Sequence, residues 1–585
     1  MAKSLRKGLT SYGDPAFSLF LRKVFIKAMG YSDDVLDRPI VGITNTYSDY
    51  NPCHGNVPDL IESVKRGVML AGGLPMVFPT ISIHESFACP TSMFLRNLMA
   101  MDTEEMIRAQ PMDAVVLIGG CDKTLPAQVM AAASADIPAI VLPVGPMVVG
   151  HHKGEVLGAC TDCRRLWGMH RAGTIVEAEI ETISGRLAPS VGTCMVMGTA
   201  STVACIVEAM GLALPMSATS PATHADRRRV AEASGKRAAE MAVAGKPKPS
   251  ELVTAESVHN ALVVLQAIGG STNGIIHLTA MAGRAGVKVE LGSLDELARE
   301  IPVLLDLKPS GAHYMEHFHH AGGLPRLMRE LSQFLHLEAL SVSGSTIGDA
   351  IAGAEDSPQD VIRSIKSPLK KMGAIAVLRG NLAPRGAVIK QSSASPELMR
   401  HKGRAVVFDS VEDMTSRIDS PGLDVAPDDV LVLRNAGPKG APGMPEAGYL
   451  PIPLKLARQG VKDMVRISDA RMSGTAFGTI VLHVTPEAAE GGPLAVVCTG
   501  DLIELDVDAR RLELLVDDQE LQGRLAAWSS SPRRKKPARG YARLFEDSVL
   551  QADQGCDFNF LLREGSATDD NETEDPKPGE NGPGG

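Results

Sequence analysis

The chain has 585 residues, more than one hydrophobic core usually supports, which favours two or more domains. Its 44% hydrophobic and 22% charged residues are typical of a globular protein rather than a fibrous or disordered one. The 59 basic and 69 acidic residues give a net charge of −10, which offers no broad attraction for a nucleic acid or an anionic membrane.

The N-terminal segment "MAKSLRKGLTSYGDPAF" becomes polar at once and lacks the apolar run of a secretory leader. The most apolar stretch, residues 137–150, is interrupted by three prolines, so it cannot span a bilayer as about 20 apolar residues would. Nine cysteines are too few for a disulfide scaffold in so long a chain. We therefore expect a cytoplasmic protein whose cysteines are free, metal-bound or catalytic.

Between residues 38 and 220, short apolar runs alternate with amphipathic stretches: "PIVGITN", "VPDLIESVKRGVMLAGG", "PMVFPTIS", "DAVVLIGG" and "AIVLPVG". Such alternation predicts βα units around a mainly parallel sheet. Further along, residues 254–268 show helical periodicity, with Thr254 as the expected N-cap and Gly269 as the expected stop. We expect residues 1–370 to form a large α/β domain.

After residue 370 the pattern changes to closely spaced short strands, which predict a β-rich, barrel-like second domain over residues 371–564. The runs are "AIAVLRG", "AVVFDS", "VLVLRN", "MVRIS", "IVLHVT", "LAVVCTG", "LIELDV" and "LELLVD". Residues 565–585 are acidic and carry no large apolar side chain, so we expect a disordered tail.

Cys121, Asp122 and Lys123 stand side by side after the apolar run 114–118, where a buried strand is expected to end. Ligands bind at that edge of open α/β sheets, although a cysteine in a tight turn is usually only a small buried residue. Cys53 and Cys194 also lie in turns rich in Gly, Pro or Asn. Three such thiols suit a soft metal or an iron–sulfur cluster, but their spacing matches no compact ligand signature.

Cys160 and Cys163 form the one compact cysteine pair, in "GACTDCRR". A single CxxC without a second pair or histidines gives only weak support for zinc. We interpret both thiols as structural and expect them on a helix; a metal-binding or redox-sensing protein that uses this pair is the alternative from another class. The remaining cysteines are also interpreted as structural.

The carboxylates of Glu85, Asp122 and Glu446 are candidates for Mg²⁺, which prefers oxygen ligands. Ser473 lies in a turn of small residues after the run "MVRIS", where backbone donors could stabilise an alkoxide, although most such serines only satisfy a turn. "GGSTNG" and "GNLAPRGAVIK" are glycine-rich but fit neither a P-loop nor a dinucleotide fingerprint. We therefore expect no nucleotide at either segment.

Seven segments together resemble the iron–sulfur dehydratases, the family of dihydroxy-acid, phosphogluconate and sugar-acid dehydratases. They are "NPCHGN", "GGCDKTLPAQVMA", "GTCMVMGTAST", "GGSTNG", "GNLAPRGAVIK", "GPKGAPGMPE" and "SDARMSGTAFG". The resemblance extends over roughly residues 8 to 563. "TNTYSDYNPCHGN" and "SDARMSGTAFGTIVLHV" are most similar to the pentonate branch, the arabinonate and xylonate dehydratases.

The resemblance implies a [2Fe–2S] cluster with one open iron position, and the matching motifs place its three ligands at Cys53, Cys121 and Cys194. It also implies Mg²⁺ beside the cluster, with ligands at Glu85, Asp122, Lys123 and Glu446. An ammonium group has no acceptor for a cation. Lys123 would therefore be carbamylated, as the resemblance implies, and Cys121, Asp122 and Lys123 would join two metal sites.

The implied activity is that of a hydro-lyase that dehydrates an aldonate such as L-arabinonate or D-xylonate to a 2-keto-3-deoxy acid. Mg²⁺ would bind the carboxylate and 2-hydroxyl, Ser473 as alkoxide would take the C2 proton, and the open iron would act as Lewis acid on the 3-hydroxyl. A homodimer or homotetramer is also implied. Within the same family, the alternative is a dihydroxy-acid dehydratase of branched-chain amino acid biosynthesis.

Overall fold

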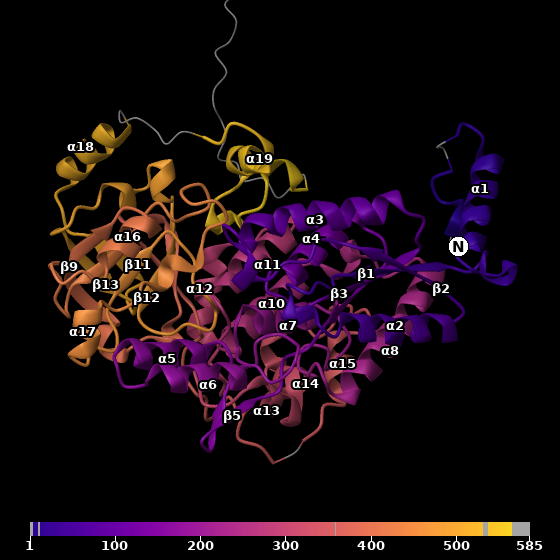
Figure 1. Ribbon diagram of the computed structural model, residues 1–585, viewed down its shortest axis with the longest axis horizontal. Helices are drawn as coiled ribbons and strands as arrows, with labels where there is room; N and C mark the ends of the chain where they lie inside the picture. Colours follow the sequence, from indigo (N-terminus) through magenta and orange to yellow (C-terminus); the bar gives the residue numbers. More distant parts are fainter. Residues whose placement is uncertain (1–3, 10–11, 357, 530–535, 564–585) are drawn as a thin grey trace, which may run out of the picture.

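The computed structural model describes residues 4–9, 12–356, 358–529 and 536–563, and it has two differently built regions (Figure 1). The N-terminal region combines a parallel sheet with many helices, and the C-terminal region contains a closed barrel. The predicted fold class is therefore confirmed. A boundary near residue 370 stays a prediction, and the predicted acidic tail at 565–585 lies outside the described residues.

The N-terminal sheet has four parallel strands in the order β2-β1-β3-β4. Its strands are β1 (Ile40–Asn45), β2 (Leu74–Pro79), β3 (Ala114–Gly119) and β4 (Ala139–Pro143). Each crossover contains one helix: α2 (Val57–Leu70), α3 (Ser92–Ala109) and α4 (Thr124–Ala135). α3 and α4 cover one face, and α2 with α8 (Ala225–Ala244) covers the other (Figure 1). β1, β3 and β4 are buried on both faces, which explains their continuous apolar runs, whereas the edge strand β2 is partly exposed.

The other helices of this region surround the sheet and its carboxyl edge. A helix was predicted over 254–268, and the structure confirms it as α10, where the Thr254 side chain accepts from the N–H of Ser257. The set is α1 (Pro15–Ala28), α5 (Thr161–Arg171), α6 (Glu177–Leu187), α7 (Thr199–Ala209), α9 (Pro249–Leu252), α10 (Ala255–Ala267), α11 (Asn273–Arg284), α12 (Leu291–Glu300), α13 (Met315–His320), α14 (Gly323–Glu330) and α15 (Ile347–Ala352), with the hairpin β5 (Gly150–His152) and β6 (Glu155–Leu157).

The barrel closes in the order β10-β11-β12-β8-β7-β14-β13-β9 and mixes parallel with antiparallel pairs. β9, β10, β11 and β12 run parallel to one another, while β7 pairs antiparallel with β8. The strands are β7 (Ala376–Gly380), β8 (Ala383–Ile389), β9 (Arg400–Phe408), β10 (Val430–Leu433), β11 (Arg466–Ser468), β12 (Ile480–Thr485), β13 (Leu502–Asp506) and β14 (Arg511–Leu514); α16 (Val411–Arg417) and α17 (Leu454–Arg458) lie between them in the chain.

Two segments of the barrel region differ from their sequence patterns. "LAVVCTG" forms a 3-10 turn, Pro493–Val496, because its carbonyls at Ala495 and Val497 accept from Arg434 instead of a neighbouring strand. β8 lies in the glycine-rich "GNLAPRGAVIK", where Gly and Pro mask a strand that pairs with β7 and β12.

The end of the chain returns to the N-terminal region after α18 (Asp518–Ser529) and α19 (Gly540–Ser548). The Asp557 carboxylate pairs with the buried Arg284 of α11, and Arg96 of α3 donates to the carbonyls of Gly555 and Cys556. One buried ion pair and buried hydrogen bonds thereby fasten the end of the chain to the N-terminal region. Among the helices in the described parts of the chain, none has the length and apolarity needed to cross a membrane.

Candidate active site

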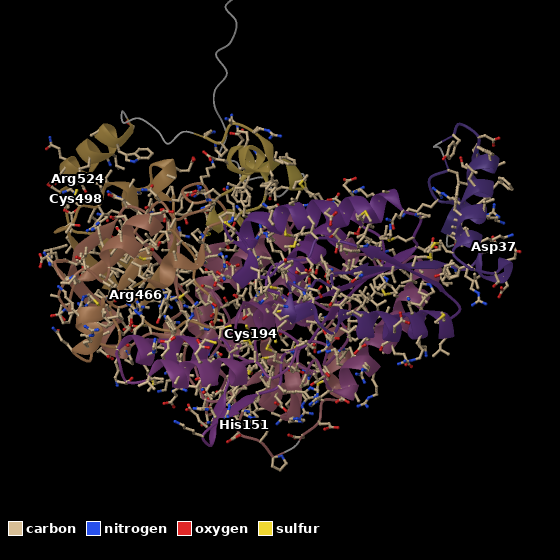
Figure 2. All side chains as sticks on the ribbon, viewed as in Figure 1. Asp37, His151, Cys194, Arg466, Cys498 and Arg524 are labelled. Atoms are coloured by element: carbon tan, nitrogen blue, oxygen red, sulfur yellow. The ribbon has the colours of Figure 1, made fainter. Side chains whose placement is uncertain are left out.

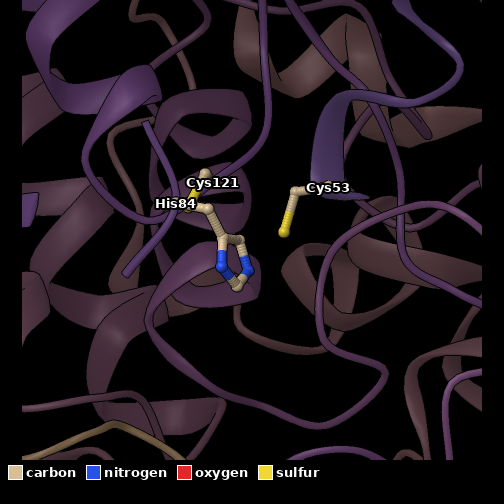
Figure 3. Close-up of side chains that lie close together, drawn as sticks. All are labelled: Cys53, His84 and Cys121. Carbon is tan, nitrogen blue, oxygen red and sulfur yellow. The ribbon is translucent and has the colours of Figure 1, made fainter. Parts of the chain in front are cut away.

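Three side chains with metal-binding atoms meet where the first three strands of the parallel sheet end. Cys53 follows β1, His84 follows β2 and Cys121 follows β3, and their ligand atoms all lie within 4.8 Å of one another. The Cys53 thiol and the His84 ring point toward a shared space in Figure 3. Because parallel strands end at one edge, loops far apart in sequence converge there. This group fits a cluster site.

Cys194 reaches the same edge through the segment that follows β4. Thr193 donates its N–H to Gly145 O at 2.9 Å and accepts from Met147 N at 2.9 Å, which aligns Cys194 with the end of that strand. Figure 2 shows Cys194 near the middle of the molecule. Its Sγ lies 3.3 Å from Sγ of Cys160, which the sequence analysis interprets as structural.

The turn that carries Cys121 is fixed by a buried histidine. His54 Nε2 accepts from the N–H groups of Gly120 and Cys121 at 2.9 and 3.1 Å, while its Nδ1 donates to Thr46 O at 2.8 Å. Burial lowers the pKa of His54 to about 4, so the ring is neutral near pH 7. A Cβ at Gly120 would lie 2.0 Å from the Val144 side chain, so the turn requires glycine there.

Two of the proposed cluster ligands, Cys53 and Cys194, have thiols whose pKa is raised in this site. A hydrogen bond with Cys121 and then burial raise the pKa of Cys53. Contact with Cys160 and then burial raise the pKa of Cys194. Repulsion between thiolates in a buried site is relieved by a cation, so the donor set suits a metal cluster.

Next to the thiols, the carboxylates of Glu85, Asp122 and Glu446 have oxygen atoms within 4.8 Å of one another. Glu85 follows β2, Asp122 follows β3, and Glu446 begins a 3-10 turn between β10 and β11 of the barrel region. Both regions therefore contribute to the site. The fully buried Lys123 ammonium lies 3.1 Å from Glu85 Oε2 and also pairs with Asp122.

Arg471, in the loop after β11, connects two of these carboxylates. Its Nη1 donates to Glu446 Oε1 at 2.6 Å, and its Nη2 lies 3.2 Å from both carboxylate oxygens of Glu85. Burial raises the pKa of Glu85, but Lys123 and Arg471 outweigh that effect and hold it well below its usual range. Burial likewise lowers the pKa of Lys123, but the three carboxylates outweigh burial and Arg471 and leave it raised.

The charges of this group provide a test of whether Mg²⁺ fits. Three carboxylates against the cations of Lys123 and Arg471 leave one net negative charge. Conversion of the Lys123 ammonium to an anionic carbamate would leave three net negative charges. One bound divalent cation would return the net charge of the group to one negative charge. The converging oxygens also match what Mg²⁺ prefers, so the residues fit that ion.

Ser473 lies two residues beyond Arg471, in a loop held against the N-terminal region. Its Oγ is 2.8 Å from Thr475 Oγ1. Asn273 Nδ2 donates to Met472 O at 3.0 Å, and Thr161 Oγ1 donates to Thr475 O at 3.0 Å. Asn273 of the glycine-rich "GGSTNG" therefore helps to anchor the serine loop.

Sequence reasoning missed three groups at this edge: His54, His84 and Arg471. His54 directly follows Cys53 within "NPCHGN", and Arg471 stands two residues before Ser473 within "SDARMSGTAFG", so both lie inside motifs from which other residues are assigned. Thr91 and Ser92 also donate their hydroxyls to Glu85. The sequence signal that could have found His54, His84 and Arg471 is a histidine or arginine within two residues of a candidate site residue.

Comparison with protein families identifies the architecture. Residues 38–350 match the dihydroxy-acid/6-phosphogluconate dehydratase N-terminal family, and residues 360–556 match the corresponding C-terminal family. The chain belongs to this family. It is therefore a dehydratase, a hydro-lyase, and the suspected resemblance is confirmed.

Individual relatives cover almost the whole chain. An L-arabonate dehydratase of Azospirillum brasilense is 48% identical, over 93% of this chain and 94% of the relative. An L-arabinonate dehydratase of Rhizobium leguminosarum bv. trifolii is 46% identical, over 94% and 95%. A 6-deoxy-6-sulfo-D-gluconate dehydratase of Pseudomonas putida is 46% identical, over 90% and 91%. All three relatives are named for sugar acids.

Proposed function

We propose that the protein dehydrates an aldonate, such as L-arabinonate or D-xylonate, to the corresponding 2-keto-3-deoxy acid. One observation carries the proposal: the consecutive residues Cys121, Asp122 and Lys123 belong to adjoining thiol and carboxylate groups at one sheet edge. Such a junction suits a substrate with a carboxylate and neighbouring hydroxyls, because both polar ends can be bound together.

We divide the proposed ligands between two cofactors according to the chemistry of their side chains. Cys53, Cys121 and Cys194 would hold a [2Fe–2S] cluster, with soft thiolates as ligands. Glu85, Asp122, Glu446 and a carbamylated Lys123 would hold Mg²⁺. When bound, these groups supply Lewis-acid charge for the substrate carboxylate and the departing hydroxyl.

Ser473 is the proposed base for the proton at C2 of the substrate. A serine hydroxyl is a poor base at neutral pH, so its alkoxide requires stabilisation by nearby donors and positive charge. Thr475 Oγ1, at 2.8 Å, is one candidate donor. Arg471, two residues away in the chain, positions Glu85 and Glu446 and adds positive charge to this part of the site.

The choice of an aldonate is supported by the relatives named for sugar acids. The family description also names dihydroxy acids, so a branched dihydroxy acid is the second candidate. A site that hydrogen-bonds the hydroxyls at C4 and C5 would lose about 1 to 3 kcal/mol for each buried group left unpaired by the branched acid. We further propose a homodimer or homotetramer, which light scattering would distinguish from a monomer.

The test is a substrate panel with anaerobically purified protein and Mg²⁺. It comprises L-arabinonate, D-xylonate, D-gluconate, 6-deoxy-6-sulfo-D-gluconate and 2,3-dihydroxyisovalerate, each assayed for 2-keto acid formation. We expect one of the two pentonates to give a kcat/KM at least tenfold above that of dihydroxyisovalerate. Preference for dihydroxyisovalerate would instead make the protein a dihydroxy-acid dehydratase.

A further inference from the structure

Two thiols beside the candidate cluster site have no role in the proposed reaction. Cys160 is the N-cap residue of α5, and Cys163 follows in the first turn of that helix. Both pack with Cys194 against an apolar cluster that contains Met147, Met195 and Tyr314. The Sγ atoms of Cys160 and Cys194 are 3.3 Å apart.

The proposed cluster ligands differ in their access to solvent. Cys53 and Cys121 are each only 4% exposed, whereas Cys194 and its neighbour Cys160 are only partly buried. Cys194 is therefore the least enclosed of the three proposed ligand residues. This least enclosed ligand also has a thiol from outside the ligand set, that of Cys160, in contact with it.

We propose that Cys160 and Cys194 form a reversible disulfide when the protein loses its cluster under peroxide stress. This inference rests on the proposed role of Cys194 as a cluster ligand, but it does not depend on which acid is the substrate. The disulfide holds Cys194 in a state that thiol reductants restore. Without it, the same sulfur is oxidised further to sulfinic and sulfonic acids, which those reductants do not reverse.

The chemistry balances with hydrogen peroxide as the oxidant. One thiolate attacks the peroxide and becomes a sulfenic acid, with hydroxide as the leaving group, which a proton converts to water. The second thiol then attacks that sulfur, the S–S bond forms and a second water leaves. The two sulfur atoms are already in contact at 3.3 Å and must approach to about 2.0 Å, the length of a disulfide bond.

Cys163 is the competing partner, since a CxxC pair at a helix N-terminus is a common redox-active arrangement. The printed sequence allows the two disulfides to be told apart. Trypsin places Cys160 and Cys163 together on residues 154–164 and Cys194 on residues 187–227. A Cys160–Cys194 bond joins two peptides, whereas a Cys160–Cys163 bond removes two hydrogens within one peptide.

The experiment treats full-length protein, freed of iron by chelation, with hydrogen peroxide, then blocks free thiols and analyses unreduced peptides by mass spectrometry. We expect the 154–164 and 187–227 peptides to be cross-linked, with fragment ions that place the bond at Cys194 and not at the buried Cys205. Cys163→Ser, the matched control, should retain the cross-link, and Cys160→Ser should lose it.

Iron uptake after reduction provides the second measurement. Treated wild type and Cys163→Ser, once reduced by dithiothreitol, should regain most of their cluster absorbance on reconstitution, whereas Cys160→Ser should regain several-fold less and carry oxidised Cys194. A bond within the 154–164 peptide, no disulfide at all, or equal recovery by Cys160→Ser would overturn the proposal. A failed substrate panel would leave these peptide results unaffected.

Discussion

His54 illustrates how a residue can matter at this site without touching a substrate. Its neutral ring accepts hydrogen bonds from the N–H groups of Gly120 and Cys121. These bonds fix the turn in which a thiol, a carboxylate and an amine follow one another in the sequence. Cys121, Asp122 and Lys123 could be selected from the sequence because they are adjacent. Arg471 lies inside one of the motifs, but its contact with Glu85, 386 residues away in the chain, is visible only in the structure.

Ser473→Ala tests the proposed base at the scale of one hydroxyl. General acid–base groups typically contribute about 10²- to 10⁴-fold, so kcat should fall by at least about 100-fold. Iron content and Mg²⁺ affinity should stay at wild-type levels, because Ser473 is not a proposed ligand of either.

The control is Ser468→Ala, which removes another hydroxyl from the same segment. Ser468 Oγ accepts from Ala470 N at 2.9 Å, so its loss measures the cost of a missing structural contact. We expect Ser468→Ala to lower the melting temperature more than kcat. A Ser473→Ala enzyme with near wild-type turnover would assign the proton to another base.

At the scale of elements, local patterns predicted the sheet strands, α10 and most of the barrel strands, because short apolar runs mark the strands and helical periodicity marks α10. They missed β8, whose Gly and Pro residues conceal the pairing with β7 and β12, and they mistook "LAVVCTG" for a strand. In that segment, hydrogen bonds from Arg434 replace those of a sheet. Long-range partners, absent from any local window, decided both cases.

α7, which follows the Cys194 loop, carries a buried carboxylate that makes stability depend on pH. Glu208 accepts from Met216 N and Ala218 N at 2.9 and 2.6 Å, yet burial raises its pKa from 4.5 to about 7. Folded protein therefore keeps this proton between about pH 4.5 and 7, where the unfolded chain has released it. The contribution of Glu208 to stability is complete below that window and falls as pH rises through it.

Glu208→Gln, which resembles the protonated acid, should remove this pH dependence. Relative to wild type, the variant should gain about 2 to 3 kcal/mol in unfolding free energy between about pH 5 and pH 8. The measurement is the difference in melting temperature between variant and wild type at the two pH values, with the exposed Glu62→Gln as control. A difference that does not change with pH would contradict the assigned burial effect.

At the scale of the whole molecule, the site forms where the sheet edge of one region meets the loops of the barrel. Glu446, Arg471 and Ser473 come from the barrel side, and the cysteines and the remaining carboxylates come from the parallel sheet. The sequence predicted both folds, but it could not predict this meeting from local patterns. The chain end adds a second connection, because Asp557 pairs with Arg284 of the N-terminal region.

Iron per chain in anaerobically purified protein tests the central claim that thiols at the sheet edge hold a cluster. We expect about two irons per wild-type chain, the [2Fe–2S] stoichiometry, and a loss of most of this iron in Cys121→Ser. Cys498→Ser, at an exposed cysteine of the barrel region far from the site (Figure 2), should keep the wild-type value. Active wild-type protein without iron, or Cys121→Ser with its full iron content, would contradict the account.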